Sequence, residues 1–363
     1  MRRPRRRRGR VATLAVVAPA LAALLLAAAA GPASAHVIGT GGRATDYRTE
    51  VDGVTPAVPG LTVRVIQAGS QLELVNRTGH ELVVLGYQSE PYLRVGPGGV
   101  DENRHSPSAY ANRFANPPRS IPAGLDPAAA PAWRHLSDAP RAVWHDHRAH
   151  WTGPDPAAVA AARGRRQLVI PSWQIPLRLG DRTVLIRGDV VWVPGPSPLP
   201  WALLALAALG AMVAVGRDHH RLRTLALLVL LGVAADVVHT AGAVAGSTAS
   251  VAVKVYGAST SVAGWLVAAI AVRRLLGRRP ASGDVYLLLA GVFLAVAGAL
   301  PDLGTLVRSQ VPSAFPAALT RTAVALTLGF GTGMIVAGLL GQRAAERAAR
   351  PAPGRGRLPD RPT

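Results

Sequence analysis

Residues 224–245 read TLALLVLLGVAADVVHTAGAVA, and this stretch decides the class of the protein. Its length matches the roughly 20 apolar residues that an α-helix needs to cross the hydrocarbon core of a bilayer. Four further apolar segments of similar length lie beside it, so the sequence predicts an all-α bundle of about five transmembrane helices over residues 200–341. The predicted spans are 200–216, 224–245, 255–272, 285–301 and 318–341.

The arginines around these segments predict the orientation of the bundle. Three arginines lie in residues 217–223, four in 273–279 and six in the basic tail 342–363, whereas the alternate loops carry little charge. Cytoplasmic loops of membrane proteins are enriched in Arg and Lys. We therefore expect a multi-pass protein of the cell membrane, with these loops and the tail in the cytoplasm. Because the net charge of +20 is concentrated in such signals, a nucleic-acid partner is not expected.

The N-terminus has the features of an export signal in the usual order. Seven arginines precede the apolar run Val11–Ala30, and Ala33–Ala35 has the small-x-small pattern of a cleavage site. Residues 1–35 are therefore predicted to be a signal peptide. Cleavage after Ala35 would make His36 the first residue of the mature protein. An uncleaved signal anchor is the alternative, since the apolar run is long enough to span a bilayer.

Residues 36–193 are predicted to form an extracytoplasmic all-β sandwich of the cupredoxin-like or immunoglobulin-like type. Short runs rich in Val, Leu and Ile alternate with turn signals. The runs 61–66, 71–76 and 81–86 are expected to pair as an antiparallel meander. Further strands are expected at 92–95, 142–147, 173–179 and 183–193.

Two other features complete this domain. Residues 106–140 are rich in Pro and Ala with little periodicity, so long loops are expected there. The chain has no cysteine, so packing alone must hold the domain together.

The proline-rich segment 194–200 is expected to be a stiff linker that spaces the domain from the bilayer.

The densest group of chemically active side chains is the sequence WHDHRAHW at residues 144–151. Alternate residues of a strand point to the same side, so His145 and His147 can both reach one metal ion. Asp146 would face away, and His150 would join only if the strand ends before it. An accidental histidine pair on a strand is the alternative to a metal site.

A free amino terminus at His36 strengthens the metal hypothesis. Its amino nitrogen and imidazole can chelate one ion, and the imidazoles of His145 and His147 would complete a set of four nitrogens. A nitrogen site of this kind prefers Cu(II), and the domain lacks the Cys and Met ligands that favour Cu(I). The expected cofactor is therefore Cu(II), with zinc as the alternative and His150 as an additional candidate ligand.

These residues carry a resemblance. An exported domain with a terminal histidine, followed about 110 residues later by Trp-His-x-His, resembles the copper-binding β domain of the particulate methane and ammonia monooxygenases. The resemblance implies that His36, His145 and His147 ligate copper. The monooxygenase polypeptide has a second β domain after its helices, whereas this sequence ends in a basic tail, so oxygenase activity is not implied. The overall plan is similar to that of CopC/CopD copper-resistance proteins, and the whole chain resembles actinobacterial membrane proteins.

The second apolar segment contains the ionisable residues Asp236 and His239. Their spacing of three puts them on one face of a helix, and such groups normally face a bundle interior, a partner or a path. A purely structural polar pair, for example Asp236 with Lys254 or with hydroxyls of the third segment, is the alternative. Asp302, at the end of the fourth segment, is expected to be only interfacial.

Three functions remain open. In copper handling, the exported domain binds Cu(II) and the bundle delivers, senses or imports the metal. The second possible function is that of a membrane scaffold whose β domain binds another exported protein. A copper-dependent redox enzyme is the third, and it would need an open coordination position and a substrate cleft. No set of catalytic residues stands out, and the expected partners are the lipid bilayer and other exported copper proteins.

Overall fold

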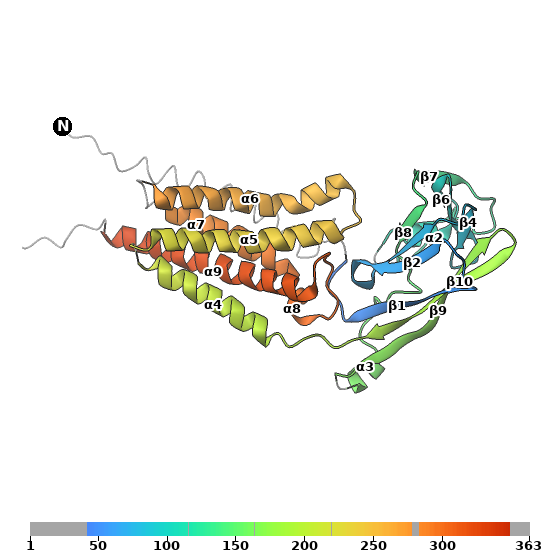
Figure 1. The fold of residues 1–363 in the computed structure, drawn as a ribbon, viewed down its shortest axis with the longest axis horizontal. Helices are drawn as coiled ribbons and strands as arrows, with labels where there is room; N and C mark the ends of the chain where they lie inside the picture. The colour runs from blue at the N-terminus through green and yellow to red at the C-terminus, as the bar shows by residue number, and fades with distance from the viewer. Residues whose placement is uncertain (1–41, 115, 163, 219, 278–282, 349–363) are drawn as a thin grey trace, which may run out of the picture.

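The computed structural model describes residues 42–114, 116–162, 164–218, 220–277 and 283–348. The predicted signal peptide, His36 and the end of the basic tail lie outside these residues. The described chain consists of a β domain followed by a helical bundle, and the two lie end to end along the long axis of the molecule (Figure 1).

Ten strands form two antiparallel sheets in the described part of the β domain. The larger sheet has the order β1-β10-β9-β4-β5-β6-β7, and the smaller has the order β2-β3-β8. Both sheets contribute to one hydrophobic core, in which Leu74, Leu82 and Ile175 are completely buried. The strands are β1 (Tyr47–Thr55), β2 (Leu61–Ile66), β3 (Gln71–Asn76), β4 (Leu82–Leu85), β5 (Pro91–Gly96), β6 (Gly99–Asn103), β7 (Trp133–Ser137), β8 (Arg141–Trp144), β9 (Gln167–Leu179) and β10 (Arg182–Trp192).

The predicted meander is correct for its first two strands and wrong for the third. β2 and β3 pair along their whole length, whereas β4 lies between β9 and β5 in the larger sheet. The side-chain amide of Asn76, at the end of β3, donates to the carbonyl oxygens of His80 and Val95, at 2.8 Å each. These bonds direct the chain away from β3 and toward β5.

Residues 106–140 contain regular structure as well as loops, contrary to expectation. The helix α2 (Pro107–Ala111) is capped by Ser106, whose hydroxyl accepts a hydrogen bond from the backbone of Ala109. Strand β7 then forms an edge of the larger sheet, and a second short helix, α3 (Ala157–Ala161), follows later. The strand expected over 142–147 ends at Trp144.

Five helices of the described chain are long and apolar enough to cross a membrane, as predicted. The fourth span, Gly283–Asp302, is not a regular α-helix throughout, because it contains a π-helical segment and a 3₁₀ turn. A single helical turn follows it. The elements are α4 (Leu199–Gly216), α5 (Leu222–Gly246), α6 (Val251–Leu276), α7 (Gly283–Val292), η3 (Phe293–Ala299), η4 (Leu300–Asp302), α8 (Gly304–Val307) and α9 (Ala317–Ala348).

Helix α9 is the central helix of the bundle because its glycines let neighbouring backbones come close. A Cβ at Gly329 would lie 2.3 Å from the carbonyl oxygen of Ala205 in α4. One at Gly331 would lie 2.7 Å from the backbone nitrogen of Ala295 in η3. Small residues are the usual means of tight helix packing in membranes, where apolar burial supplies little attraction between helices.

The β domain is bonded to the end of the bundle that faces it, which we call the β-facing end. Asp46 accepts hydrogen bonds from Nη1 of Arg308 at 2.7 Å and from the backbone of Ser309 at 2.8 Å. Thr45 and Gln310 form a short antiparallel bridge beside this ion pair. Figure 1 shows the start of β1 next to α8 at this junction.

The proline-rich linker lies against the end of the bundle. A Cβ at Gly195 would lie 1.7 Å from the carbonyl oxygen of Val307, at the end of α8. The same position is 3.3 Å from a carboxylate oxygen of Asp46. The linker therefore belongs to the junction between the two parts of the chain.

Candidate functional site

The three histidines of segment 144–151 lie in a turn after β8, in residues 145–150, which we call the histidine loop. Because the strand has already ended, strand parity does not decide where these side chains point. Contacts from two sides of the loop decide it instead. One side faces the interior of the domain, and the other faces the turn η1 (Gln67–Gly69).

Asp146 anchors the histidine loop to the interior. Its carboxylate is 1% exposed and accepts hydrogen bonds from Nε1 of Trp144 at 3.1 Å and from Nε and Nη2 of Arg148 at 2.8 Å each. Arg148 also donates to the carbonyl oxygens of Leu85 and Gly86. Both members of this buried ion pair therefore have several partners, as such pairs require.

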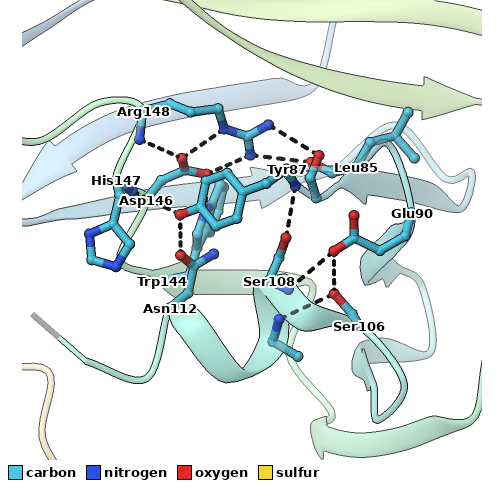
Figure 2. Close-up of polar contacts among 12 residues, drawn as sticks. Leu85, Tyr87, Glu90, Ser106, Ser108, Asn112, Trp144, Asp146, His147 and Arg148 are labelled. Carbon is cyan, nitrogen blue, oxygen red and sulfur yellow. Dashed lines mark hydrogen bonds and ion pairs between the residues drawn. The ribbon is translucent and has the colours of Figure 1, made fainter. Parts of the chain in front are cut away.

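Tyr87 supports the loop at His147, as Figure 2 shows. Its hydroxyl accepts a hydrogen bond from the backbone nitrogen of His147 at 2.9 Å and is bonded to Oδ1 of Asn112. The phenol ring stacks on the imidazole of His147 and lies under the guanidinium of Arg148. Burial raises the pKa of Tyr87, so its hydroxyl keeps the proton that it donates to Asn112.

Glu90 extends the same buried network. Its carboxylate accepts from the hydroxyl of Ser106 at 2.7 Å and from the backbone nitrogens of Ser108 and Gln88 at 3.1 and 2.9 Å. Burial alone would raise the pKa of Glu90, but hydrogen bonds from Ser108, Ser106 and the backbone hold it below its usual value. The hydroxyl of Ser108 also accepts from the backbone of Tyr87 at 2.8 Å, which joins the two groups (Figure 2).

His145 and His147 each bond one ring nitrogen to a backbone carbonyl. Nδ1 of His145 lies 2.7 Å from the carbonyl oxygen of Ser70, and its Nε2 lies 3.1 Å from the amide nitrogen of Gln71. An Nδ1–H donor leaves the lone pair of Nε2 to accept from Gln71. Nε2 of His147 lies 3.3 Å from the carbonyl oxygen of Ala111, and its Nδ1 is buried without a hydrogen-bond partner.

His150 lies close to the other two histidines. Its Nδ1 is also buried without a partner, while the imidazole forms a hydrogen bond with the backbone of Gly69. Burial, with a contribution from His145 and His147, lowers the pKa of His150 to about 4. Burial likewise lowers the pKa of His145. Both rings are therefore neutral at pH 7, which is the form of imidazole that binds metals.

The turn that receives these histidines has an unusual backbone. Gln67, Ala68 and Gly69 have φ values of 55°, 55° and 93°, in the left-handed region that non-glycine residues rarely adopt. The hydroxyl of Thr49 lies 3.1 Å from the carbonyl oxygen of Gly69 and 2.5 Å from that of Ala149. Strand β1 thus ties the turn to the histidine loop.

Hydrogen bonds continue from this turn to the bundle. Thr248, in the connection between α5 and α6, donates to Oε1 of Gln71 at 2.7 Å and accepts from Nε2 of Gln67 at 2.9 Å. Since Gln71 also contacts His145, a polar chain links the histidine loop to the β-facing end of the bundle.

A cleft of about 580 Å³ lies beside this chain, between the smaller sheet and the bundle. Its lining includes Arg48, Arg64 and Arg141, and Glu73 forms ion pairs with the last two. The excess of positive charge makes the cleft a poor place for a metal cation, so the histidine loop remains the candidate site in the β domain.

The described residues do not form a finished metal site. A ligating histidine usually bonds one ring nitrogen to a protein acceptor and offers the other to the metal. His147 and His150 follow this arrangement, whereas both ring nitrogens of His145 have hydrogen-bond partners. However, no three His, Asp or Glu side chains among the described residues lie close enough to hold a metal ion. The remaining predicted ligand, His36, lies outside the described residues.

Asp236 and His239 face the interior of the bundle, and both are buried. Oδ2 of Asp236 accepts a hydrogen bond from Nε1 of Trp265 in α6 at 2.8 Å. Nε2 of His239 lies 2.9 Å from Oδ2 of Asp302 at the end of η4. The expectation that Asp302 is only interfacial was wrong, because this residue pairs with a buried histidine.

In comparisons with known proteins, no family model, curated protein or solved structure matches this chain. The resemblances to the copper-binding domain of the monooxygenases and to CopC/CopD proteins therefore remain hypotheses that rest on the residues alone. The architecture is that of a β-sheet region followed by five apolar helices, which is compatible with a multi-pass membrane protein.

The histidines are evident in the sequence, whereas the residues that position them are not. Tyr87 and Glu90 lie in the turn between β4 and β5, and a phenol and a carboxylate between two apolar strands were a usable signal. Gln71 and Thr248 had no such signal, because they are 177 residues apart and meet only in the folded chain.

Proposed function

We propose that this chain is a membrane protein whose β domain binds Cu(II) through His36, His145 and His147, for delivery, sensing or import of copper. The observation that carries the proposal is the arrangement of the histidine loop. Its imidazoles are close enough to influence one another's charge, and they are held by backbone groups through one ring nitrogen. This support is typical of metal-binding histidines. His150 is the additional candidate ligand, and zinc is the alternative metal.

The position of Gly42 favours participation of His36. The backbone nitrogen of Gly42 donates to Oε1 of Gln67 at 2.8 Å, and a Cβ at Gly42 would lie 2.9 Å from Oγ of Ser70. Ser70 is also the residue whose carbonyl contacts His145. An extended chain of six residues reaches about 20 Å, which is enough for residue 36 to return to the histidine loop.

The proposal includes an orientation and a fold type. The arginine distribution favours an extracytoplasmic β domain and a cytoplasmic tail. Removal of the signal peptide after Ala35 would create the amino-terminal ligand. The two sheets around one core are of the kind found in cupredoxin-like and immunoglobulin-like sandwiches, and we propose that the domain is of this type.

The test is a titration of the processed full-length protein, beginning at His36, in lipid nanodiscs with Cu(II). We expect stoichiometric binding with an EPR spectrum of nitrogen-coordinated Cu(II). The spectrum should be lost in His145→Ala and when one residue is added before His36. It should persist in His135→Ala, the matched control, because His135 is exposed and bonded to Asp101 and Asp138.

Binding no tighter than that of free histidine would overturn the proposal and favour the scaffold function. A spectrum that is unchanged in His145→Ala would show that the copper is bound elsewhere, and would overturn it equally. Stronger binding of Zn(II) than of Cu(II), with the same dependence on His145, would support the proposed ligands and identify zinc as the metal.

A further inference from the structure

The cleft of about 580 Å³ at the β-facing end of the bundle has one charged wall and one neutral wall. The charged wall belongs to the β domain, and its charged residues are Arg48 of β1, Arg64 of β2, Glu73 of β3 and Arg141 of β8. The described bundle residues that line the opposite wall are uncharged, and most of them are small. A cleft of this volume is within the size range of ligand-binding sites in proteins.

Glu73 lines the cleft but is covered by two arginines. Its side chain is 2% exposed, whereas those of its ion-pair partners Arg64 and Arg141 are 71% and 49% exposed. Burial alone would raise the pKa of Glu73, but hydrogen bonds from Arg64 and Arg141 hold it below its usual value, so the carboxylate is ionised at neutral pH. Because a guanidinium has five N–H donors, both arginines can bind a second anion while they remain bonded to Glu73.

Arg48 adds a further positive charge to the same wall. Its Nη2 lies 2.6 Å from Oε1 of Glu50, and the other oxygen of Glu50 lies 2.7 Å from Nη2 of Arg166. Together with the group at Glu73, four guanidinium groups therefore share two carboxylates, and two positive charges are in excess. The Nε of Arg48 is also buried without a hydrogen-bond partner among the described residues. A buried donor without an acceptor is costly, so an anion bound beside it would stabilise this wall.

Neighbouring segments of the chain supply no anion for this excess. Residues 36–41, which precede Gly42 beside the turn η1, contain no acidic residue. Asp46, at the adjoining junction, is already paired with Arg308. The excess of positive charge therefore favours an anionic ligand from outside the chain.

The position of the cleft indicates the source of that ligand. Among its lining residues is Gly246, the last residue of α5, and α6 begins shortly after it at Val251. Val251 and Val255, in the first two turns of α6, are 77% and 64% exposed. Since membrane-spanning helices end near the level of the lipid headgroups, a basic cleft at that level adjoins an apolar surface that suits acyl chains.

Phosphate is the anion that fits this combination. Guanidinium groups bind phosphate oxygens through paired N–H donors, and basic side chains near a membrane surface attract anionic lipids. We propose that the cleft binds the phosphate of an anionic phospholipid headgroup through Arg48, Arg64 and Arg141, with the acyl chains along the exposed start of α6. This site is separate from the histidine loop and does not depend on copper.

The test is a titration of the full-length protein in a neutral detergent with phosphatidylglycerol, followed by native mass spectrometry. We expect saturable binding that is tighter than that of phosphatidylcholine, whose headgroup has no net charge. Arg48→Gln combined with Arg64→Gln removes the excess charge and leaves one arginine on each carboxylate, so the fold should be retained. The affinity for phosphatidylglycerol should fall by about 30-fold, the effect expected of two arginines near an anionic headgroup.

Arg178→Gln combined with Arg182→Gln is the matched control. It removes the same two charges from exposed positions at the turn between β9 and β10. Strand β10 runs from there to Trp192, which pairs with Tyr47 close to the junction, so the control residues lie at the far end of the strand. Because charges separated by more than about 10 Å in water are screened by salt, the control should change the affinity by less than about twofold.

Equal losses in the two double variants, or equal affinities for phosphatidylglycerol and phosphatidylcholine, would overturn the proposal. Inorganic phosphate is the third probe. If it binds as tightly as phosphatidylglycerol, with the same dependence on Arg48 and Arg64, the ligand is a soluble anion and the assignment to a lipid is wrong. Should the double variant fail to fold, Arg48→Gln alone, which leaves the ion pairs of Glu73 intact, should weaken lipid binding by about fivefold. An unchanged affinity in that variant would contradict the proposal.

Discussion

Asp146 and Arg148 alternate with the histidines along the loop, so a buried ion pair lies between the candidate metal ligands. The pair takes the loop backbone out of strand geometry, because the carboxylate turns inward to Trp144 and the guanidinium reaches the end of β4. At the scale of single residues, these charges therefore position the imidazoles. Removal of either charge should disturb the conformation of the histidine loop more than that of the two sheets.

Replacing Asp146 by Asn leaves the guanidinium of Arg148 without its counterion. Because breaking a buried ion pair costs about 3–5 kcal/mol, and Arg148 is 21% exposed, we expect the free energy of unfolding to fall by about 3 kcal/mol. Urea unfolding followed by tryptophan fluorescence measures this change. Asp138→Asn is the control, since this carboxylate is fully exposed, and should change stability by less than about 0.5 kcal/mol. Equal stability of the two variants would contradict the role of Asp146.

Glu90 makes the stability of the β domain dependent on pH. Its hydrogen bonds lower its pKa, against burial, below the value of about 4.3 that it has when unfolded. The stabilisation is therefore complete at neutral pH and is lost as the pH falls below about 4.3 through the folded pKa. We expect Glu90→Gln to be less stable at neutral pH by about 1–3 kcal/mol and to depend less on pH in this acidic range.

Thermal unfolding followed by circular dichroism at several pH values measures the effect of Glu90. The control is Glu81→Gln, because the side chain of Glu81 is 57% exposed and lies 3.6 Å from its ion-pair partner Arg94. An acid dependence that is the same in Glu90→Gln and in the wild-type protein would argue against this account.

At the scale of elements, the glycines of α9 determine how closely the spans pack. In Gly329→Ala the new methyl group would meet the backbone of Ala205, which cannot move without shifting α4. Since overpacking costs typically about 1–3 kcal/mol, we expect a loss of that size, seen as a lower midpoint of thermal unfolding in detergent. Gly210→Ala is the matched control, because a Cβ there meets nothing within 4 Å. A similar loss in both variants would point to glycine flexibility instead of packing.

The spans were predictable from the sequence because the bilayer requires a fixed length of apolar residues, and the apolar run 224–245 became Leu222–Gly246. Strand pairing was less predictable because it depends on distant contacts. The amide of Asn76 that joins β3 to β5 has no local signature. The histidine pair was visible in the sequence, whereas the end of its strand at Trp144 was not. That end depends on contacts of the loop with Tyr87 and with the carbonyl of Leu85, which form only on folding.

At the scale of the whole molecule, the two parts of the chain are joined by segments from its beginning and from near its end. Asp46 precedes the first strand, and its partners Arg308 and Ser309 follow the fourth span, 262 and 263 residues later. The polar chain through Thr248 makes a second connection. The histidine loop in the β domain and the buried residues Asp236 and His239 in the bundle therefore lie on either side of one hydrogen-bonded junction.

The distance along the chain between Asp46 and Ser309 has a consequence for biogenesis. All ten described strands are synthesised before α4, so the β domain has the residues it needs to fold while the spans are still emerging from the ribosome. The hydrogen bond between Asp46 and Ser309 can form only after the fourth apolar helix has been synthesised. An incomplete chain would thus display a folded domain with the carboxylate of Asp46 uncovered, and only a chain with that span in place would hide it. The junction between Asp46 and residues 308 and 309 therefore forms only in a chain that has been synthesised beyond the fourth span.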